Sequence, residues 1–206
     1  MKKEARKQSA VERAEEVFKK HGGMMKTTDA LSSGIHPETL YSLLEAGRVE
    51  KLSRGLYRLT GSPPLGDPDL IVVAKRIPRG VICLVSALFF HELTTQIPHK
   101  VQIALRFGTA KPRLNFPPIE TFHFSGKAFT AGVETHELED VPIKVFGPEK
   151  TLADCVKFRN RIGMETVVEA LRLYRDRKPV KVDELMRFAS ICRVERIIRP
   201  YLEAVL

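Results

Sequence analysis

The amino-acid sequence predicts an α+β protein with two domains, a small one at the N-terminus and a larger one after it. The first 60 residues show the pattern helix, short helix, turn, helix and hairpin. Residues 61–68 then hold three prolines and two glycines, which interrupt helices and central strands. Strand-like segments followed by amphipathic helices make up the rest of the chain. We therefore place the domains at residues 1–62 and 63–206.

The first domain is expected to contain three helical segments. The first helix has its apolar positions at helical spacing, at Val11, Ala14, Val17 and Phe18. A short segment at 27–31 and a turn at 32–34 precede the next helix, from Ile35 to Ala46. Pro37 suits the first turn of that helix, and Gly47 suits the position that ends it. Leu40, Leu43 and Leu44 should face the domain core.

A hairpin follows, with strands around 49–52 and 56–59 and a turn at Ser53-Arg54-Gly55. Two helices joined by a turn and followed by a hairpin form a winged helix-turn-helix. In that arrangement one helix enters the DNA major groove, and the hairpin contacts the adjoining backbone. The sequence therefore predicts that the N-terminal domain binds double-stranded DNA.

The candidate DNA-binding residues are polar or basic side chains of these segments. They are Thr27, Thr28, His36, Thr39, Tyr41, Ser42, Arg48, Lys51, Arg54 and Arg58. Polar side chains on the helix can bond base edges or phosphates, and the hairpin cations suit phosphates or a minor groove. An ordinary solvated basic edge is the alternative reading of the hairpin.

Two acidic residues, Glu38 and Glu45, should lie on the exposed side of the same helix. Because negative charge there opposes an electrostatic grip on DNA, we expect modest affinity from one copy of the domain. A monomer or a weak dimer that cooperates on DNA fits this expectation, since a second contact raises the affinity.

The second domain should combine a small mixed sheet with terminal helices. Helical patterns are expected at 69–76 and 81–93, and strands at 101–105, 119–124, 133–138 and 141–146. Further helices are expected at 148–162, 165–175, 182–190 and 194–205. In the helix at 148–162, Leu152, Cys155, Phe158 and Ile162 form the apolar face, and Lys150, Asp154, Lys157 and Arg161 line the opposite side. That side is either a solvated face or a functional surface.

Composition limits the class of protein. The net charge of +9 and the isoelectric point of about 9.6 favour polyanionic partners. No stretch is long and apolar enough to cross a membrane, and the charged N-terminus is unlike a signal peptide, so we expect a cytoplasmic protein. Cys83, Cys155 and Cys192 are widely spaced, which argues against disulfides and zinc and favours reduced core residues.

The residue patterns of common enzymes are missing from the sequence. No glycine-rich segment is followed by Gly-Lys-Ser/Thr, as nucleotide hydrolysis requires. The strand ending at Lys144 resembles a nuclease motif, but Pro142 stands where a metal-binding acid is needed. The six histidines lack partners at ligand spacing. We therefore expect no catalytic residue, metal or cofactor.

Three segments resemble the AbiEi family of antitoxins. They are the hairpin sequence at 47–58, the Ser86-Ala87-Leu88 and His91-Glu92-Leu93 segment, and the stretch from Glu149 to Gly163, which opens with Glu-Lys-Thr-Leu-Ala-Asp-Cys. Members of this family are transcriptional regulators found with a nucleotidyltransferase-like toxin in type IV toxin–antitoxin and phage-abortive systems. The resemblance covers most of the chain.

The resemblance implies a division of labour between the two domains. The N-terminal domain would repress the protein's own operon by binding its operator, and the C-terminal domain would be needed for antitoxicity and would assist operator binding. The toxin would be neutralised directly or indirectly. Candidates for this second DNA or partner surface are Arg106, Lys111, Arg113, Lys150, Lys157 and Arg161. The family has no catalytic site, in agreement with the residues.

Two other functions stay open at this point. A winged-helix regulator whose second domain senses a small molecule would show a bound ligand among the apolar residues of that domain. A nuclease with a DNA-targeting domain would cleave DNA in a metal-dependent reaction. A toxin gene beside this one would favour the antitoxin. The sequence leaves the operator sequence and the oligomeric state undetermined.

Overall fold

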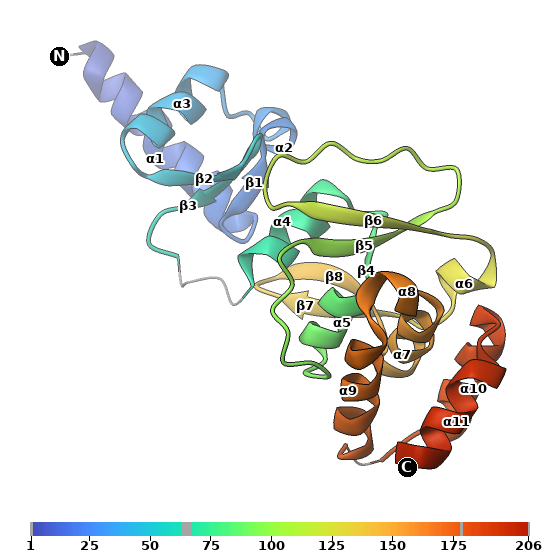
Figure 1. The fold of residues 1–206 in the computed structure, drawn as a ribbon. Coiled ribbons are helices and arrows are strands. Elements are labelled where there is room, and N and C mark those ends of the chain that lie inside the picture. Colours follow the sequence, from blue (N-terminus) through green and yellow to red (C-terminus); the bar gives the residue numbers. More distant parts are fainter. Residues whose placement is uncertain (1, 63–66, 178, 206) are drawn as a thin grey trace. The chain divides into compact units, whose positions relative to one another are not determined.

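A computed structural model describes residues 2–62, 67–177 and 179–205 (Figure 1). Contacts within the chain divide it into two compact units, Met1–Pro68 and Asp69–Leu206. The proline- and glycine-rich segment at 61–68 is the last part of the first unit, and its residues 63–66 lie outside the described residues. Helices and two sheets occur together, so the expected α+β class is confirmed.

Unit 1 packs three helices against a three-stranded antiparallel sheet. The helices are α1 (Lys2–Lys20), α2 (Thr27–Ser32) and α3 (Pro37–Glu45), and the strands are β1 (Met24–Lys26), β2 (Val49–Ser53) and β3 (Leu56–Leu59). The strand order is β1-β3-β2, so β3 is central. The sequence pattern does not predict β1, because three residues carry too little alternation to identify a strand.

The core of unit 1 joins the apolar faces of α1 and α3 to the sheet. Phe18 and Leu43 have no exposed surface, and Leu40 and Met25 are buried beside them. The expected inward face of α3 is therefore confirmed. The helix is shorter than the expected 35–46, because Pro37 stands in its first turn and His36 is its N-cap.

Unit 2 contains a five-stranded mixed sheet, which Figure 1 shows with helices packed beside it. Its strands are β4 (Val81–Ile82), β5 (Val101–Arg106), β6 (Ile119–Phe124), β7 (Val133–Leu138) and β8 (Val141–Phe146). Their order is β6-β5-β4-β8-β7. β4 pairs antiparallel with β5 and parallel with β8, so it joins two halves of the sheet.

The expected helix at 81–93 is wrong in its first part. Val81 and Ile82 form the central strand, and the helix α5 covers only Leu84–Phe90. A buried strand and a buried helix both consist of consecutive apolar residues, which is why the pattern was ambiguous. The four strands expected between 101 and 146 are confirmed within one residue.

The helices of unit 2 are α4 (Pro68–Arg76), α5, α6 (Lys127–Thr130), α7 (Pro148–Lys157), α8 (Arg159–Ile162), α9 (Met164–Arg175), α10 (Val182–Cys192) and α11 (Glu195–Val205). The expected helix at 148–162 is divided at Phe158, and the short α6 was missed. α7 is central to the core, because it contacts α5, α9 and α10. Eight consecutive residues of α7, from Glu149 to Val156, are buried.

The expected solvated side of the helix at 148–162 is wrong for two of its four residues. Lys150 and Asp154 have no exposed surface, whereas Lys157 and Arg161 are exposed. α7 is covered on several sides by other helices, so a polar side of the helix still lies in the interior. A helical pattern shows which residues share a face, but not how many faces the fold covers.

Candidate nucleic-acid interface

A tight turn fixes α3 relative to α2 in unit 1. Gly34 has a φ angle of 84°, which glycine adopts without steric cost, and the amide of Ile35 donates to the carbonyl of Ala30 at 3.0 Å. The side chain of Ile35 is buried, so the turn is anchored in the core. His36 then caps α3, with its Nδ1 accepting from the amide of Glu38 at 3.4 Å.

The polar residues predicted on α3 differ in how available they are. Tyr41 is 63% exposed, and His36 is exposed at the N-terminus of the helix. Thr39 and Ser42 are half-buried, and the Ser42 hydroxyl donates to the carbonyl of Glu38 at 2.8 Å. Ser42 therefore offers a partner its acceptor lone pairs, while its proton is engaged within the helix.

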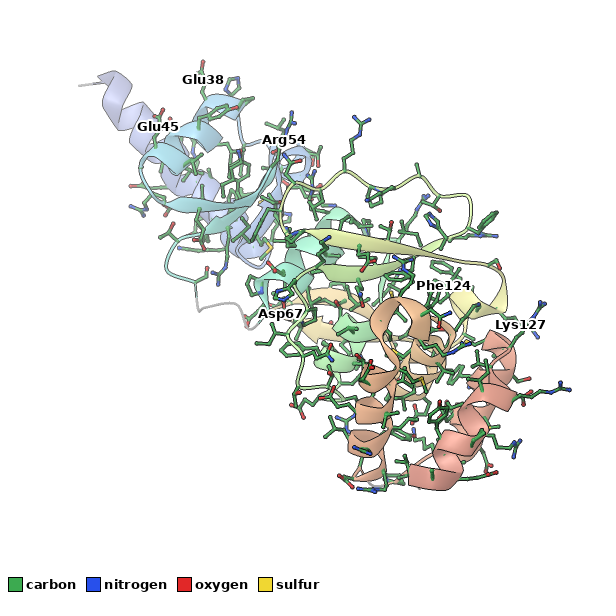
Figure 2. The ribbon with its side chains drawn as sticks, in the orientation of Figure 1. Glu38, Glu45, Arg54, Asp67, Phe124 and Lys127 are labelled. Carbon is green, nitrogen blue, oxygen red and sulfur yellow. The ribbon has the colours of Figure 1, made fainter. Side chains whose placement is uncertain are left out.

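Acidic side chains accompany these polar groups. Glu38 and Glu45 are exposed, as expected, and Figure 2 shows both on α3. In α2, the amide of Thr27 donates to the carbonyl of Gly55 at 3.0 Å, which ties the start of that helix to the hairpin. The Thr28 hydroxyl is exposed and donates to Asp29 at 3.2 Å.

Arg54 is the exposed cation at the turn of the hairpin, labelled in Figure 2, and Lys51 is exposed on β2. Within the described part of the chain, the structure records no ion pair for either side chain. Arg48 is also exposed, but its guanidinium binds Glu15 of α1 through two contacts, Nε–Oε1 at 2.5 Å and Nη2–Oε2 at 2.8 Å. Arg54 and Lys51 are thus the hairpin cations most available to phosphates.

The expected exposed position of Arg58 is wrong. Arg58 is only 8% exposed, and its Nη1 lies 3.2 Å from Oε1 of Glu50. Arg58 belongs to the central strand β3, where it stands opposite Met24 on one side and Glu50 on the other. Its guanidinium is paired with Glu50, so Arg58 is less available to a phosphate than Arg54 or Lys51.

Five of the six residues predicted for the second surface are exposed. Arg106, Lys111 and Arg113 are exposed at the end of β5 and in the loop that follows it, and Lys157 is exposed at the end of α7. Arg161 is also exposed, but it stacks on the Phe122 ring at 4.0 Å and pairs with Glu120 at 2.5 Å. Lys150 is buried and is removed from this surface.

Lys150 instead belongs to a buried polar cluster that sequence analysis missed. Its Nζ donates to Asp154 and lies over the Phe146 and Phe124 rings, 4.1 and 5.0 Å from their centres. The other Asp154 oxygen accepts from the Cys192 thiol at 3.1 Å. Burial raises the pKa of Asp154 and raises that of Cys192 to about 12. The spacing of Lys150 and Asp154 by four residues was the sequence signal for this pair.

The three cysteines are free and buried, in agreement with the expected reduced core residues. Burial also raises the pKa of Cys83 and Cys155, so both thiols stay protonated and unreactive near neutral pH. In the residues that the structure describes, no group of three or more His, Cys, Asp or Glu side chains is placed to hold a metal ion. None of the described helices is long and apolar enough to cross a membrane.

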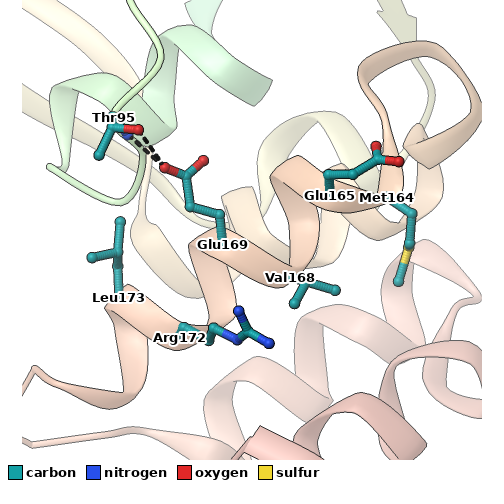
Figure 3. Close-up of a pocket in the computed structure, with 7 residues that line it drawn as sticks. All are labelled: Thr95, Met164, Glu165, Val168, Glu169, Arg172 and Leu173. Carbon is teal, nitrogen blue, oxygen red and sulfur yellow. Dashed lines mark hydrogen bonds between the residues drawn. The ribbon is translucent and has the colours of Figure 1, made fainter.

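A pocket of about 710 Å³ lies along α9 (Figure 3). Its lining residues are Thr95, Met164, Glu165, Val168, Glu169, Arg172 and Leu173. Glu169 closes one side, because its Oε1 accepts from the amide and hydroxyl of Thr95 at 2.9 and 2.6 Å. These hydrogen bonds lower the pKa of Glu169. The remaining lining is largely apolar and open to solvent.

Comparisons with known proteins agree with the N-terminal pattern. Residues 12–60 match the family model described as "Transcriptional regulator, AbiEi antitoxin". No curated protein matches the chain. A crystal structure of the RV2827C protein from Mycobacterium tuberculosis has a similar fold, with a TM-score of 0.53 and 14% sequence identity over 87% of this chain and 75% of that chain. The similarity to the AbiEi antitoxin family of transcriptional regulators is thus located in residues 12–60, the segment that contains α2, α3 and the hairpin.

Proposed function

We propose that this chain is a DNA-binding autorepressor and the antitoxin of a type IV toxin–antitoxin system that acts in phage defence. The observation that carries the proposal is the family match over residues 12–60, the segment that contains α2, α3 and the hairpin. In this proposal, unit 1 is a winged helix-turn-helix that reads the operator, and the chain neutralises a nucleotidyltransferase-like toxin. No enzymatic step is part of the mechanism.

DNA recognition would divide between α3 and the hairpin. Tyr41, His36 and the partly exposed Thr39 and Ser42 would contact base edges or phosphates in the major groove. Arg54 and Lys51 would contact the backbone beside it, or Arg54 would enter a minor groove. Glu38 and Glu45 keep the single-copy affinity modest, so cooperation between copies or help from the second domain would raise it.

The second domain, residues 63–206, would supply antitoxicity and support operator binding. Arg106, Lys111, Arg113, Lys157 and Arg161 are exposed and basic, so they suit a second contact with DNA or with the toxin. Arg161 contributes least to a phosphate contact, because Glu120 already neutralises it. The toxin would be affected by direct contact or through repression of its gene.

Binding to the promoter tests the regulatory part of the proposal. Fluorescence anisotropy would compare a labelled fragment from upstream of this gene with a scrambled fragment, at two salt concentrations. We expect tighter and sequence-dependent binding to the upstream fragment. Equal binding to both fragments with a steep salt dependence would reduce the protein to a basic chain with general affinity for polyanions.

Growth of cells that express the neighbouring toxin tests the antitoxin part. Co-expression of the full chain should restore growth, and expression from an unrelated promoter separates neutralisation from repression of the toxin gene. If growth is restored only when the toxin gene keeps its own promoter, repression alone accounts for the protection. A failed pull-down of the toxin would not contradict the proposal, because neutralisation does not require a stable complex.

The pocket along α9 favours a second candidate function, a regulator whose C-terminal domain senses a small molecule. Its volume of about 710 Å³ suits a drug-sized ligand, and its apolar lining is interrupted by a few polar groups. Replacement of Val168 by Trp would place a large ring in this pocket and reduce the space left for a ligand. If operator affinity responds to small molecules in the parent protein but not in Val168→Trp, the sensing function is supported.

A further inference from the structure

The loop between β5 and β6, residues 107–118, is held at both ends by backbone hydrogen bonds. At its start, the amide of Phe107 donates to the carbonyl of Phe124 at 2.7 Å, which extends the β5–β6 ladder by one residue. At its end, the carbonyl of Pro118 accepts from the amide of Val101 at 2.9 Å. The ring of His123 contacts the carbonyl of Thr109 at 3.0 Å. The loop is therefore anchored to the sheet on either side of its exposed middle.

This loop is basic, and it contains no acidic side chain to neutralise its positive charge. Arg106, Lys111 and Arg113 are all exposed, and the sequence from 106 to 118 contains no acidic residue. The carboxylate just beyond the loop, Glu120, is occupied by Arg161 and by the side-chain amide of Gln102. Within the ranges the structure covers, no ion pair is recorded for the three loop cations. They thus present positive charge to solvent.

Two aromatic rings accompany the cations. Phe107 is 75% exposed and Phe116 is 58% exposed. An exposed phenyl ring loses the free energy that burial would supply, so two in one short basic loop indicate a surface that acquires a partner. Pro112, Pro117 and Pro118 restrict the backbone of the same loop. Restriction before binding lowers the entropic cost of placing the rings against a partner.

We propose that the loop of residues 107–118 binds single-stranded nucleic acid. Phe107 and Phe116 would stack on unpaired bases, and Arg106, Lys111 and Arg113 would contact the phosphates between them. Proteins that bind single strands combine these two parts, a positively charged path for the backbone and aromatic rings for the bases. A regular duplex hides the faces of its bases, so it would use the cations but not the rings.

The order of residues along the loop favours a nucleic acid over an anionic membrane. A loop that inserts into a membrane gathers its apolar side chains where it enters the lipid, with cations nearer the headgroups. Here Phe107 and Phe116 stand near the ends of the loop, and Lys111 and Arg113 lie between them. In that order, the two cations occupy the middle of the loop, which is the part that would have to leave water to enter a membrane.

Fluorescence anisotropy of the full chain tests the proposal with three labelled probes of equal length. They are oligothymidine of about 12 nucleotides, an abasic strand with the same number of phosphates, and a duplex unrelated to the upstream fragment. We expect the oligothymidine to bind at least about tenfold more tightly than the abasic strand, because only the former offers bases for stacking. Equal affinity for these two strands would overturn the proposal.

Substitution of the two rings separates stacking from general hydrophobic contact. In the double variant Phe107→Leu/Phe116→Leu, the surface stays apolar but loses its aromatic faces, so oligothymidine affinity should fall about tenfold or more. Phe107→Tyr/Phe116→Tyr should keep the parent affinity. The control Ile97→Ala removes another apolar side chain, 73% exposed, and should change nothing. A leucine variant that binds as well as the parent, or binding to anionic vesicles that exceeds binding to oligothymidine, would refute the stacking role.

This inference does not depend on the proposed operator binding. Oligothymidine has no operator sequence, and the rings lie in unit 2, whereas the helix and hairpin that would read the operator lie in unit 1. A chain that fails to distinguish the upstream fragment from the scrambled one is still expected to prefer oligothymidine over the abasic strand. The two proposals therefore fail separately.

Discussion

Lys150 and Asp154 form an ion pair one helical turn apart in α7, with no exposed surface on either side chain. The Cys192 thiol and the rings of Phe124 and Phe146 surround the pair. Two charges withdrawn from water are tolerated in the core only because each has a partner of opposite sign and further polar or aromatic contacts. Loss of either partner leaves the other charge buried and uncompensated.

Replacement of Lys150 by Met should therefore destabilise unit 2. We expect the free energy of unfolding to fall by about 3–5 kcal/mol, because Asp154 would stay buried without its partner. Urea denaturation monitored by circular dichroism measures the change. Lys157→Met alters the same helix at an exposed position and should stay within about 0.5 kcal/mol of the parent. An equal effect of both variants would show that the buried pair has no special role.

Gly132 approaches this cluster closely. A Cβ atom at Gly132 would lie 2.7 Å from the Cβ of Lys150 and 2.9 Å from the Phe188 ring, at a φ angle of 72°. Gly132→Ala should cost more than Gly108→Ala, since Gly108 has a similar φ angle of 84° but open space around it. We expect about 1–2 kcal/mol for Gly108→Ala from the backbone alone, and a larger loss at Gly132. Similar melting temperatures for the two variants would contradict the close contact.

The free energy of unfolding should depend on pH through His91. Burial lowers the pKa of His91 below its usual value near 6.5, while its Nε2 contacts the carbonyl of Phe146 at 2.8 Å. The unfolded chain binds the proton more readily, so stability should be complete above about pH 7 and fall as the pH drops below the unfolded pKa. Urea titrations between about pH 8 and 5 should show this slope. His91→Gln should flatten it, whereas the exposed control His99→Gln should preserve it.

Arg48→Ala should act mainly on the stability of unit 1. The side chain of Glu15 is only 12% exposed and would lose both of its contacts with the guanidinium. We expect a loss of about 1–2 kcal/mol in thermal unfolding. Lys19→Ala removes a pair with Glu16 in which both side chains are about 60% exposed, so it should be nearly neutral. Two equally stable variants would mean that the Arg48–Glu15 pair contributes no more than an ordinary surface pair.

Arg54→Ala should weaken binding to all DNA sequences alike. Loss of one phosphate contact lowers the slope of log affinity against log salt by about one, without a change of sequence preference. Anisotropy at several salt concentrations gives this slope. Lys127→Ala removes an exposed cation from α6 and serves as the control, since it lies in the other unit. If Arg54→Ala binds like the parent, the hairpin does not contact DNA.

Sequence reasoning succeeded where the pattern itself determines the structure. The alternating segments at 119–124, 133–138 and 141–146 are strands, and Leu40 and Leu43 of α3 are buried. In these places local periodicity and tertiary packing agree. The family match at 12–60 covers the segment in which the sequence predicts the short helix, the turn, the next helix and the hairpin.

The errors arose where burial depends on distant residues. Val81 and Ile82 become a strand because β5 and β8 lie on either side of them, and no neighbour in sequence reveals that. Lys150 was placed on a surface because its partners Phe124, Phe146 and Cys192 come from other segments. Arg58 and Arg48 were counted as available cations, yet Glu50 and Glu15 bind them. Charge alone does not reveal which cations are already paired.

The position of β4 also governs the order in which unit 2 can assemble. Ile82 pairs with Ile103 on one side, but its other neighbour, Val145, comes much later in the chain. During synthesis, β4, β5 and β6 are therefore complete while one edge of β4 is still open and the residues of α7 have not been made. Closing so long a loop is slow, and an unpaired apolar edge is prone to aggregation. A chain shortened before Val145 would keep that open edge permanently, so truncation there should yield insoluble protein rather than a smaller folded domain.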